Sequence, residues 1–516
     1  MVGLTLLLGL AVATVLLAPL AERVNLPYPV VLLMFGLVLA FVPKMPSPTV
    51  NAELILPLVL PPLLFAAARR TSWRQFLDNR RAIGLLAIAL VGVTAFAVGA
   101  VLHAIVPGLP FIAAVALGAA VAPPDPVAAT AVAHKLRLPR RLRTILEGEG
   151  LSNDATSLVL YEVAVASTVS GAFAPWHAGA ALGGAVVIGV VVGLVTAAAT
   201  RWLLKKLPAH PAGSALVLVM PFAAYVAADA LHGSGVLAVV TIALGLSRYS
   251  DHESALTRLV SGNTWEIIEL LVTGAAFAFV GLELRAVADQ VDGPMGALIG
   301  QALAITGVVV AVRFLWIFPI AALDKRLLRR RRDRAEPVGW RETTIASWAG
   351  MRGVVTLAAV LALPAGFPER ERLIFIAFVV IIATMLVQGL TLPLLVKRLG
   401  VTASSDDQDA EEQELLTRAR DAGFRRLDEV RDRNDTDDGA IEQARENARR
   451  MWHSLGMDNQ VERSSAGSSQ TVNALKEELL EAARDAVVEA RAESGADPLV
   501  VDRVLRRLDA RGTDSG

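Results

Sequence analysis

Long apolar runs alternate with short polar segments along the first 400 residues of the chain. Thirteen of these runs could cross a bilayer as helices, since the hydrocarbon core takes about 20 helical residues. They lie near residues 2–20, 28–42, 54–68, 82–106, 111–134, 144–169, 178–203, 214–231, 235–247, 264–284, 297–323, 340–363 and 372–396. The pattern predicts an all-α polytopic membrane protein with about 13 transmembrane helices, which form a transmembrane domain over residues 1–400.

The pattern changes after residue 400. Residues 401–516 are highly charged and contain no run long enough to cross a membrane. Apolar residues recur there at helical spacing instead. They are Leu415, Ala419, Leu427 and Val430, followed by Leu475, Leu479, Leu480, Ala483 and Val487. We therefore expect a second domain, a charged helical tail that is either a solvated appendage or a regulatory or dimer-contacting unit.

Basic residues are concentrated in alternate loops. Loops rich in Lys and Arg follow the third, fifth, seventh and eleventh runs, whereas residues 107–110, 170–177 and 230–234 contain neither. Basic loops stay on the cytoplasmic side of a membrane. This places the N-terminus outside and the tail in the cytoplasm, with an odd number of spans between them, in the plasma (inner) membrane. The first run has no basic residue before it, which favours a retained span over a signal peptide.

Composition supports a membrane protein and excludes some chemistry. The 516 residues are 54% hydrophobic, with a mean hydropathy of +0.52, which is high for a soluble domain. The formal net charge is zero, and no cysteine is present. Disulfides, thiolate metal sites and cysteine nucleophiles are therefore excluded.

Two of the thirteen runs are interrupted in a similar way. The fifth is broken by Pro123, Pro124 and Pro126, which remove backbone donors and clash with the preceding turn. The twelfth contains the segment Gly350-Met351-Arg352-Gly353, a charge between two glycines. Prolines and glycines also kink ordinary membrane helices. Paired interruptions in two halves of a chain, however, indicate the midplane site of a transporter, and here each has a charged residue beside it.

The sixth run contains charges that packing does not explain. Glu149, Asn153 and Asp154 share one helical face, and Asp125 lies in the broken fifth run. A charged side chain at the bilayer centre costs at least ~2.5–3.5 kcal/mol. A carboxylate withdrawn from water can hold either a proton or a desolvated monovalent cation, and competition between the two is all that coupled exchange requires. We therefore predict that Asp154 and Asp125 bind H⁺ and a cation such as Na⁺ through their oxygens.

Other groups near these aspartates leave alternatives open. Buried Glu149 needs a positively charged partner. Two arginines in predicted spans, Arg313 and Arg352, are available, and either would be a fixed structural counter-charge because arginine stays protonated. Three hydroxyl groups are candidate ligands, although each also suits helix packing: those of Ser152, Thr130 and Ser157.

Together these motifs resemble those of the monovalent cation:proton antiporter family 1, the sodium/proton exchangers of bacterial NhaP and animal NHE type. The resemblance covers residues 1–400 and depends on the order of four motifs. They are Asp125-Pro126-Val127-Ala128, Glu149-Gly150-Leu151-Ser152-Asn153-Asp154, Arg313 and Gly350-Met351-Arg352-Gly353. The resemblance implies an inverted-repeat antiporter fold of thirteen helices, two of them broken, usually in a homodimer whose core domain moves against a dimerisation domain.

The resemblance also implies roles for single residues. Asp154 is similar to the carboxylate that exchanges Na⁺ for H⁺, and Asp125 to its helper where the broken helices cross. Asn153 is similar to the neighbour that is typical of electroneutral members. Arg352 resembles the core arginine of the family.

The sequence matches the family pattern in one ion pair and departs from it in two places. Glu149 with Arg313 resembles the stabilising ion pair of the family. Pro124, however, stands where a threonine usually precedes the aspartate, and Gly150 and Ser152 replace a serine and a phenylalanine. The resemblance thus implies that two possible hydroxyl ligands, those of the threonine and the serine, are absent here, which bears on the choice of ion and the affinity for it.

We therefore predict a secondary antiporter, and not an enzyme, that exchanges Na⁺, or K⁺ or Li⁺, for H⁺ and contributes to pH and sodium homeostasis. A cation channel is one alternative, although the sequence has no filter-like repeat. An intramembrane aspartyl protease is another, since two buried aspartates could act as an acid–base pair. The expected partners are the two ions, lipid and a second copy of the chain, with no cofactor and no nucleic acid.

Overall fold

The structure is a computed structural model of the chain. It describes residues 2–24, 26–42, 52–70, 79–125, 138–171, 175–206, 211–247, 255–331, 339–401, 405–433, 437–456, 470–493 and 498–513. These residues form helices and connecting turns and contain no β-strand. The prediction of an all-helical chain is confirmed.

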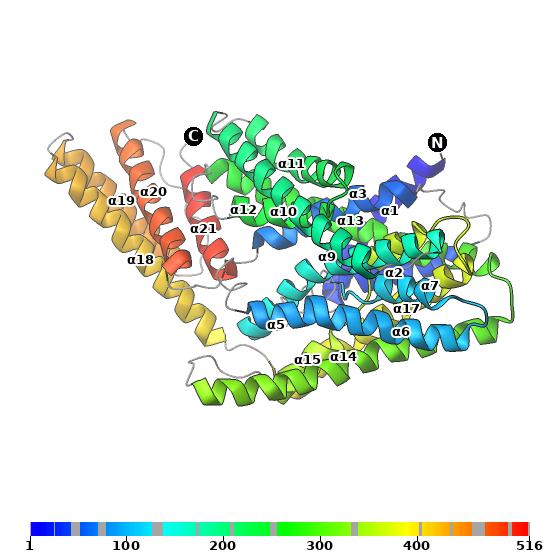
Figure 1. The fold of residues 1–516 in the computed structure, drawn as a ribbon. Coiled ribbons are helices and arrows are strands. Elements are labelled where there is room, and N and C mark those ends of the chain that lie inside the picture. The colour runs from blue at the N-terminus through cyan, green and yellow to red at the C-terminus, as the bar shows by residue number, and fades with distance from the viewer. Residues whose placement is uncertain are drawn as a thin grey trace.

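Helices occupy every one of the thirteen predicted runs (Figure 1). They are α1 (Val2–Arg23), α2 (Tyr28–Ala40), α3 (Ala52–Arg70), α5 with η1 and α6 (Arg80–Gly84, Leu85–Leu90, Val91–Ile105), α7 (Phe111–Val121), α9 (Arg140–Ser170), α10 (Pro175–Lys206), α11 (Pro211–Ala230), α12 (Gly235–Ser247), α13 (Ala255–Asp289), α14 (Met295–Arg331), α15 with α16 (Trp340–Trp348, Val354–Leu361) and α17 (Arg370–Leu399).

Six helical segments of the described chain are long and apolar enough to cross a membrane by themselves. Four shorter helices of 10–17 residues are also apolar, α7 and α12 among them. Two of the remaining runs fall short for physical reasons that bear on function. The twelfth is divided between α15 and α16, and α9 contains the charged residues Arg143, Glu147, Glu149 and Asp154.

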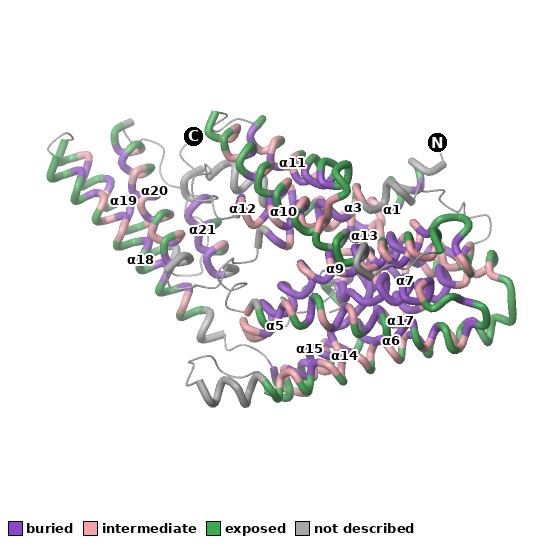
Figure 2. Tube along the Cα trace, viewed as in Figure 1, coloured by how far each residue is buried: buried purple, intermediate pink, exposed green. Residues whose placement is uncertain are grey.

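The outward faces of several helices are apolar. On α10, Val187 and Val195 are each 62% exposed, and on α14 Leu315 is 74% exposed. Figure 2 shows such exposed residues along the outer edges of the helical body. In contrast, α7 is buried from Ala113 to Val121 and is surrounded by other helices. The molecule therefore has apolar side chains facing outward around a closely packed interior, as a protein in lipid requires.

Small residues let α7 approach α6 closely. A Cβ atom on Gly118 of α7 would collide with the backbone carbonyl of Ala95 on α6. A Cβ atom on Gly99 of α6 would likewise meet the side chain of Val115 on α7. Such small residues are typical of helix contacts in membranes, where packing replaces the hydrophobic effect. They fix the position of the helix that ends beside Asp125.

The tail consists of four helices: α18 (Ser405–Asp432), α19 (Asp438–Gly456), α20 (Gln470–Glu493) and α21 (Pro498–Thr513). They lie beside the other helices in Figure 1. The apolar residues predicted at helical spacing in the tail are all buried in one hydrophobic cluster, which contains residues of 415–508 alone. Within the described residues, ion pairs connect the tail to the rest of the chain, among them Arg506 with Glu266 at 2.5 Å and Arg140 with Glu411 at 3.6 Å.

Candidate cation site

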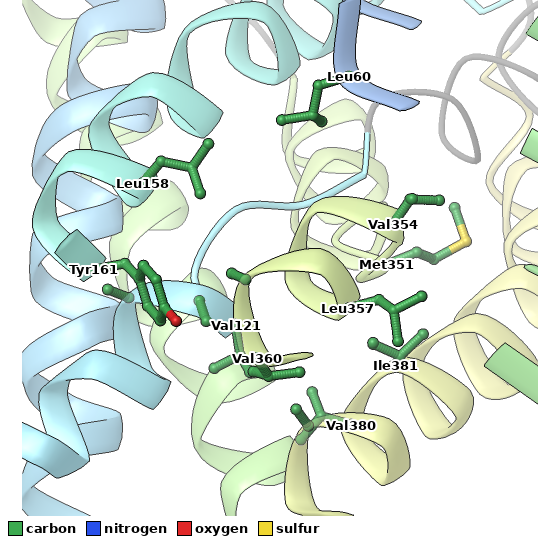
Figure 3. Close-up of a cluster of buried hydrophobic side chains, with 14 of the residues drawn as sticks. Leu60, Val121, Leu158, Tyr161, Met351, Val354, Leu357, Val360, Val380 and Ile381 are labelled. Atoms are coloured by element: carbon green, nitrogen blue, oxygen red, sulfur yellow. The ribbon is translucent and has the colours of Figure 1, made fainter. Parts of the chain in front are cut away.

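Two interrupted helical elements meet at the centre of the fold. Helix α7 ends at Val121 and is followed by the irregular segment Ala122–Asp125, while residues 349–353 separate α15 from α16. The backbone N–H of Asp125 donates to the carbonyl of Met351 at 2.7 Å, so the two irregular segments are directly bonded. Figure 3 shows buried apolar side chains around this meeting point, among them Leu60, Val121 and Val354. Irregular backbone is tolerated at this depth because protein surrounds it.

Arg352 satisfies the backbone where α7 ends. Its Nε donates to the carbonyl of Val121 at 2.7 Å and its Nη2 to that of Ala122 at 3.1 Å. Its Nη1 donates to the carbonyl of Gly350. The last carbonyls of a helix have no partner within the helix, and a cation near them also suits the helix dipole. Arg352 therefore caps α7 and is not the partner of Glu149, which was one of the two alternatives.

Glu149 is paired with Arg313. The two guanidinium nitrogens lie 2.5 and 2.8 Å from the two carboxylate oxygens, a bidentate arrangement. Arg313 also donates from Nε and Nη2 to the carbonyl of Ala346, at 3.1 and 3.0 Å. Both side chains are only 2% exposed. The pair connects α9, α14 and α15. Every buried side-chain nitrogen and oxygen atom of Glu149 and Arg313 has a hydrogen-bond partner.

Beyond Glu149, the polar side chains on one face of α9 point toward α7 and the irregular segment after it. Asn153 is fully buried, and its Nδ2 donates to the carbonyl of Pro124 at 3.4 Å, while its Oδ1 has no hydrogen-bond partner in the described chain. Ser157 donates to the carbonyl of Ala119 at 2.8 Å. Both bonds hold α9 against α7 and the segment after it. Asp154, which is 2% exposed, lies between them in the sequence.

Asp154 and Asp125 line the same small cavity, whose volume is about 20 Å³. A space of this size holds about one water molecule or a desolvated ion of similar size. Its apolar wall comes mainly from α3, and its other side from the first turn of α16. The lining residues are Leu60, Leu63, Leu64, Pro123, Pro124, Asp125, Asp154, Gly353, Val354, Val355 and Thr356.

The glycines of the twelfth run have a clear packing role. A Cβ atom on Gly353 would collide with the carboxyl group of Asp125. A Cβ atom on Gly350 would contact the side chain of Arg313 at 2.6 Å. Each glycine therefore gives room to a charged side chain from another element. Glycine is needed at both positions because the side chains of Asp125 and Arg313 occupy the space that a Cβ atom would fill.

The structure thus brings together some of the predicted residues and not others. Asp125 and Asp154 line one cavity, and Asn153 is bonded to its rim at Pro124. Ser157 is used in a helix contact, and Ser152 is half-buried and does not line the cavity. Thr130 lies outside the described residues.

Among the polar residues that line the cavity, one was not predicted, namely Thr356 of α16. A lone threonine in an apolar helix gives no sequence signal, because its hydroxyl group usually bonds to its own helix. The described residues contain no group of three or more His, Asp or Glu side chains that could hold a metal ion. Two carboxylates with neutral oxygen donors nearby form a ligand set that suits a hard alkali cation as the transported ion.

Sequence comparison identifies relatives over the membrane part of the chain. Residues 11–398 match the family described as "Sodium/hydrogen exchanger, transmembrane". An uncharacterised Na⁺/H⁺ exchanger of Mycobacterium tuberculosis is 37% identical over 410 residues, which cover 77% of this chain and 74% of that protein. A sodium, potassium, lithium and rubidium/H⁺ antiporter of Bacillus subtilis is 32% identical over 390 residues, covering 72% of this chain and 58% of that protein.

Structural comparison shows the same fold in a solved protein. The sodium proton antiporter MjNhaP1 of Methanocaldococcus jannaschii superposes with a TM-score of 0.59 at 18% identity. The match covers 77% of this chain and 96% of that protein. The predicted antiporter fold is therefore confirmed by the arrangement of the helices and not by sequence similarity alone.

Proposed function

Because the chain belongs to the sodium/hydrogen exchanger family, we propose that it exchanges Na⁺, or K⁺ or Li⁺, for H⁺, with Asp154 as the group that holds the two ions in turn. The observation on which this proposal rests is the buried cavity that Asp154 shares with Asp125 where the two interrupted elements meet. Asp125 supplies a second carboxylate oxygen, and the unpaired Oδ1 of Asn153 is a neutral acceptor close by. The relatives are named for H⁺ exchange with alkali cations, which agrees with this donor set.

The charges around the site favour a one-for-one exchange. Asn153 cannot take up a proton, and Glu149 is fully used by Arg313. With Asp125 in one protonation state throughout the cycle, the site gains one positive charge whether Asp154 binds H⁺ or a monovalent cation. If the cavity opens to one side of the membrane at a time, as in other transporters with interrupted helices, a cycle moves no net charge. We infer an electroneutral exchanger that contributes to pH and sodium homeostasis.

The setting of the site in the cell is inferred from the loops. The basic loops support a plasma-membrane protein whose N-terminus is outside, with residues 401–516 as a cytoplasmic domain. The exposed apolar faces of the helices would contact lipid and the partner in a homodimer. Neither the channel nor the protease alternative finds support, since the family match and the named relatives are exchangers.

Everted vesicles with a pH-sensitive dye test the proposal. Addition of Na⁺, K⁺ or Li⁺ to acidified vesicles should release protons in the wild type, with and without a membrane potential. Asp154→Asn should abolish this response while the protein is still made and inserted. Glu147→Gln, on the same helix but paired with Arg143, is the matched control and should retain it. Full activity of Asp154→Asn would remove Asp154 from the mechanism.

The same vesicles distinguish an exchanger from a channel, and electroneutral from electrogenic exchange. A channel would carry a cation current without proton release when the potential is clamped. A strong dependence of proton release on the membrane potential would contradict the electroneutral stoichiometry, though not exchange itself.

A further inference from the structure

Thr356 is the one side-chain hydroxyl group among the residues that line the cavity. The residue is 1% exposed, and its Oγ1 is a buried atom without a hydrogen-bond partner in the described chain. A buried hydroxyl that forms no bond costs about 1–3 kcal/mol. Such a cost calls for an explanation, because buried polar groups are otherwise satisfied.

Several other buried threonines of the described chain behave differently, and Thr273 on α13, whose hydroxyl group also has no partner there, does not line the cavity. Thr14, Thr200 and Thr384 each donate to the carbonyl four residues earlier in their own helix, at 2.8, 2.7 and 2.8 Å. Thr356 is the third residue of α16, so the residue four positions earlier is Arg352, which lies before the helix begins. The interruption of the twelfth run therefore removes the usual partner of this hydroxyl group. It leaves the oxygen beside a cavity that two carboxylates also line.

We propose that the Thr356 hydroxyl is a third oxygen ligand of the transported cation, together with the carboxylates of Asp154 and Asp125. This inference rests on the exchange function proposed above and names a further residue that sets its affinity. The three ligands come from three separate elements: α9, the segment after α7, and the first turn of α16. A site assembled in this way is complete only while the three elements are in contact.

The chemistry of the group fits this role. A hydroxyl oxygen is a hard, neutral donor that can replace one water of an alkali cation without adding charge. When Asp154 instead carries a proton, the same oxygen can accept a hydrogen bond from it. Pro124, which precedes Asp125, has no hydroxyl group, whereas Thr356 supplies one from the first turn of α16. Loss of the hydroxyl should therefore weaken cation binding more than it affects the maximal rate.

Proteoliposomes of the full chain test the proposal. Thr356→Val removes the hydroxyl with little change in shape, and Thr356→Ser keeps it. We expect Thr356→Val to raise the Na⁺ concentration for half-maximal proton release by about 3- to 10-fold, the equivalent of one hydrogen bond. The maximal rate should stay within about twofold, because the lost contact is made in the bound ground state. Thr356→Ser should restore the wild-type value. Thr200→Val, which removes a buried hydroxyl on α10, is the control and should not change it.

A second measurement does not depend on transport. Na⁺ that binds the folded state should raise the melting temperature of the protein in detergent, relative to choline at equal ionic strength. This shift should be smaller in Thr356→Val than in the wild type and Thr200→Val. An unchanged half-maximal Na⁺ concentration together with an unchanged melting shift would overturn the role of Thr356 and leave the exchange function intact. A wild type that releases no protons with any alkali cation would instead overturn the proposed function itself.

Discussion

Two kinds of buried carboxylate lie close together on α9. Glu149 has both oxygens bonded to Arg313 at 2.5 and 2.8 Å, and its partner is held further by the carbonyl of Ala346. Asp154, just over one turn later, faces a cavity that it shares with a second carboxylate. A fully bonded carboxylate has no reason to change its partner, whereas one beside a cavity can. Two neighbouring carboxylates on one helix therefore have different surroundings, and the proposed exchange assigns the transported ions to the one beside the cavity.

The ion pair yields the first prediction at this scale. Glu149→Gln should lower the free energy of unfolding by about 3–5 kcal/mol, because Arg313 would remain buried without its counter-charge. Thermal unfolding in detergent and the yield of monodisperse protein measure this. Glu414→Gln, which breaks the exposed pair of Glu414 with Arg418 on α18, is the control and should cost less than about 1 kcal/mol. Equal stability of the two variants would contradict the structural role of the pair.

The charged residues by themselves left open which arginine pairs with Glu149, whereas the family resemblance implied Arg313, which the structure confirms. Arg313 and Arg352 both lie in predicted spans, so either could have been the partner of Glu149. Only the three-dimensional arrangement shows that Arg352 bonds instead to the carbonyls of Val121 and Ala122. Thr356 could not be predicted for a related reason. Its hydroxyl is unpaired only because α16 begins at Val354, a boundary that the apolar pattern does not define.

At the scale of elements, the interruptions are best understood as a pair. Prolines end α7 and glycines separate α15 from α16, and these breaks were predictable because Pro and Gly have direct backbone effects. In the folded chain, each irregular segment supplies hydrogen-bond partners for the backbone of the other. The backbone of Asp125 bonds to Met351 at 2.7 Å, and the side chain of Arg352 caps α7. The two elements therefore form one unit, and damage to one should disturb the other.

Gly353 tests this coupling. Gly353→Ala adds a methyl group where the Asp125 carboxyl lies, so the carboxyl must move. Overpacking of this kind costs about 1–3 kcal/mol. We therefore expect at least about a tenfold loss of cation-dependent proton release in everted vesicles. Gly366→Ala is the control, since a Cβ atom there meets nothing within 4 Å. If both variants transport equally well, the contact between Gly353 and Asp125 is not important for the site.

At the scale of the whole molecule, thirteen predicted runs became helices, although only six described segments are long and apolar enough to qualify by themselves. Part of the deficit arises at the charged helix and at the interrupted elements. Helix α9 is too polar because it carries the site, and α7, α15 and α16 are short because the chain is interrupted there. A strict search for apolar helices would therefore miss the elements that matter most. The alternation of basic and neutral loops still indicates these spans, because it depends on the charges between the helices and not on how apolar each helix is.

That alternation makes a prediction about orientation that this chain is well suited to test. The sequence has no cysteine, so a single introduced thiol has no background. Gly366→Cys places one in the exposed turn between α16 and α17, and Gln443→Cys places one on the exposed face of α19. With the N-terminus outside, the first position should lie outside the cell and the second in the cytoplasm.

A membrane-impermeant maleimide should therefore label Gly366→Cys in intact cells and Gln443→Cys only after permeabilisation. Both sites should react fully in detergent, which controls for accessibility of the thiol itself. Labelling of Gln443→Cys in intact cells would place the tail outside and would invert every helix in the membrane. In that case the basic loops would face the wrong side, and the exchange would have to be described in the opposite orientation. The cation site would remain unchanged, because its contacts do not depend on which side is the cytoplasm.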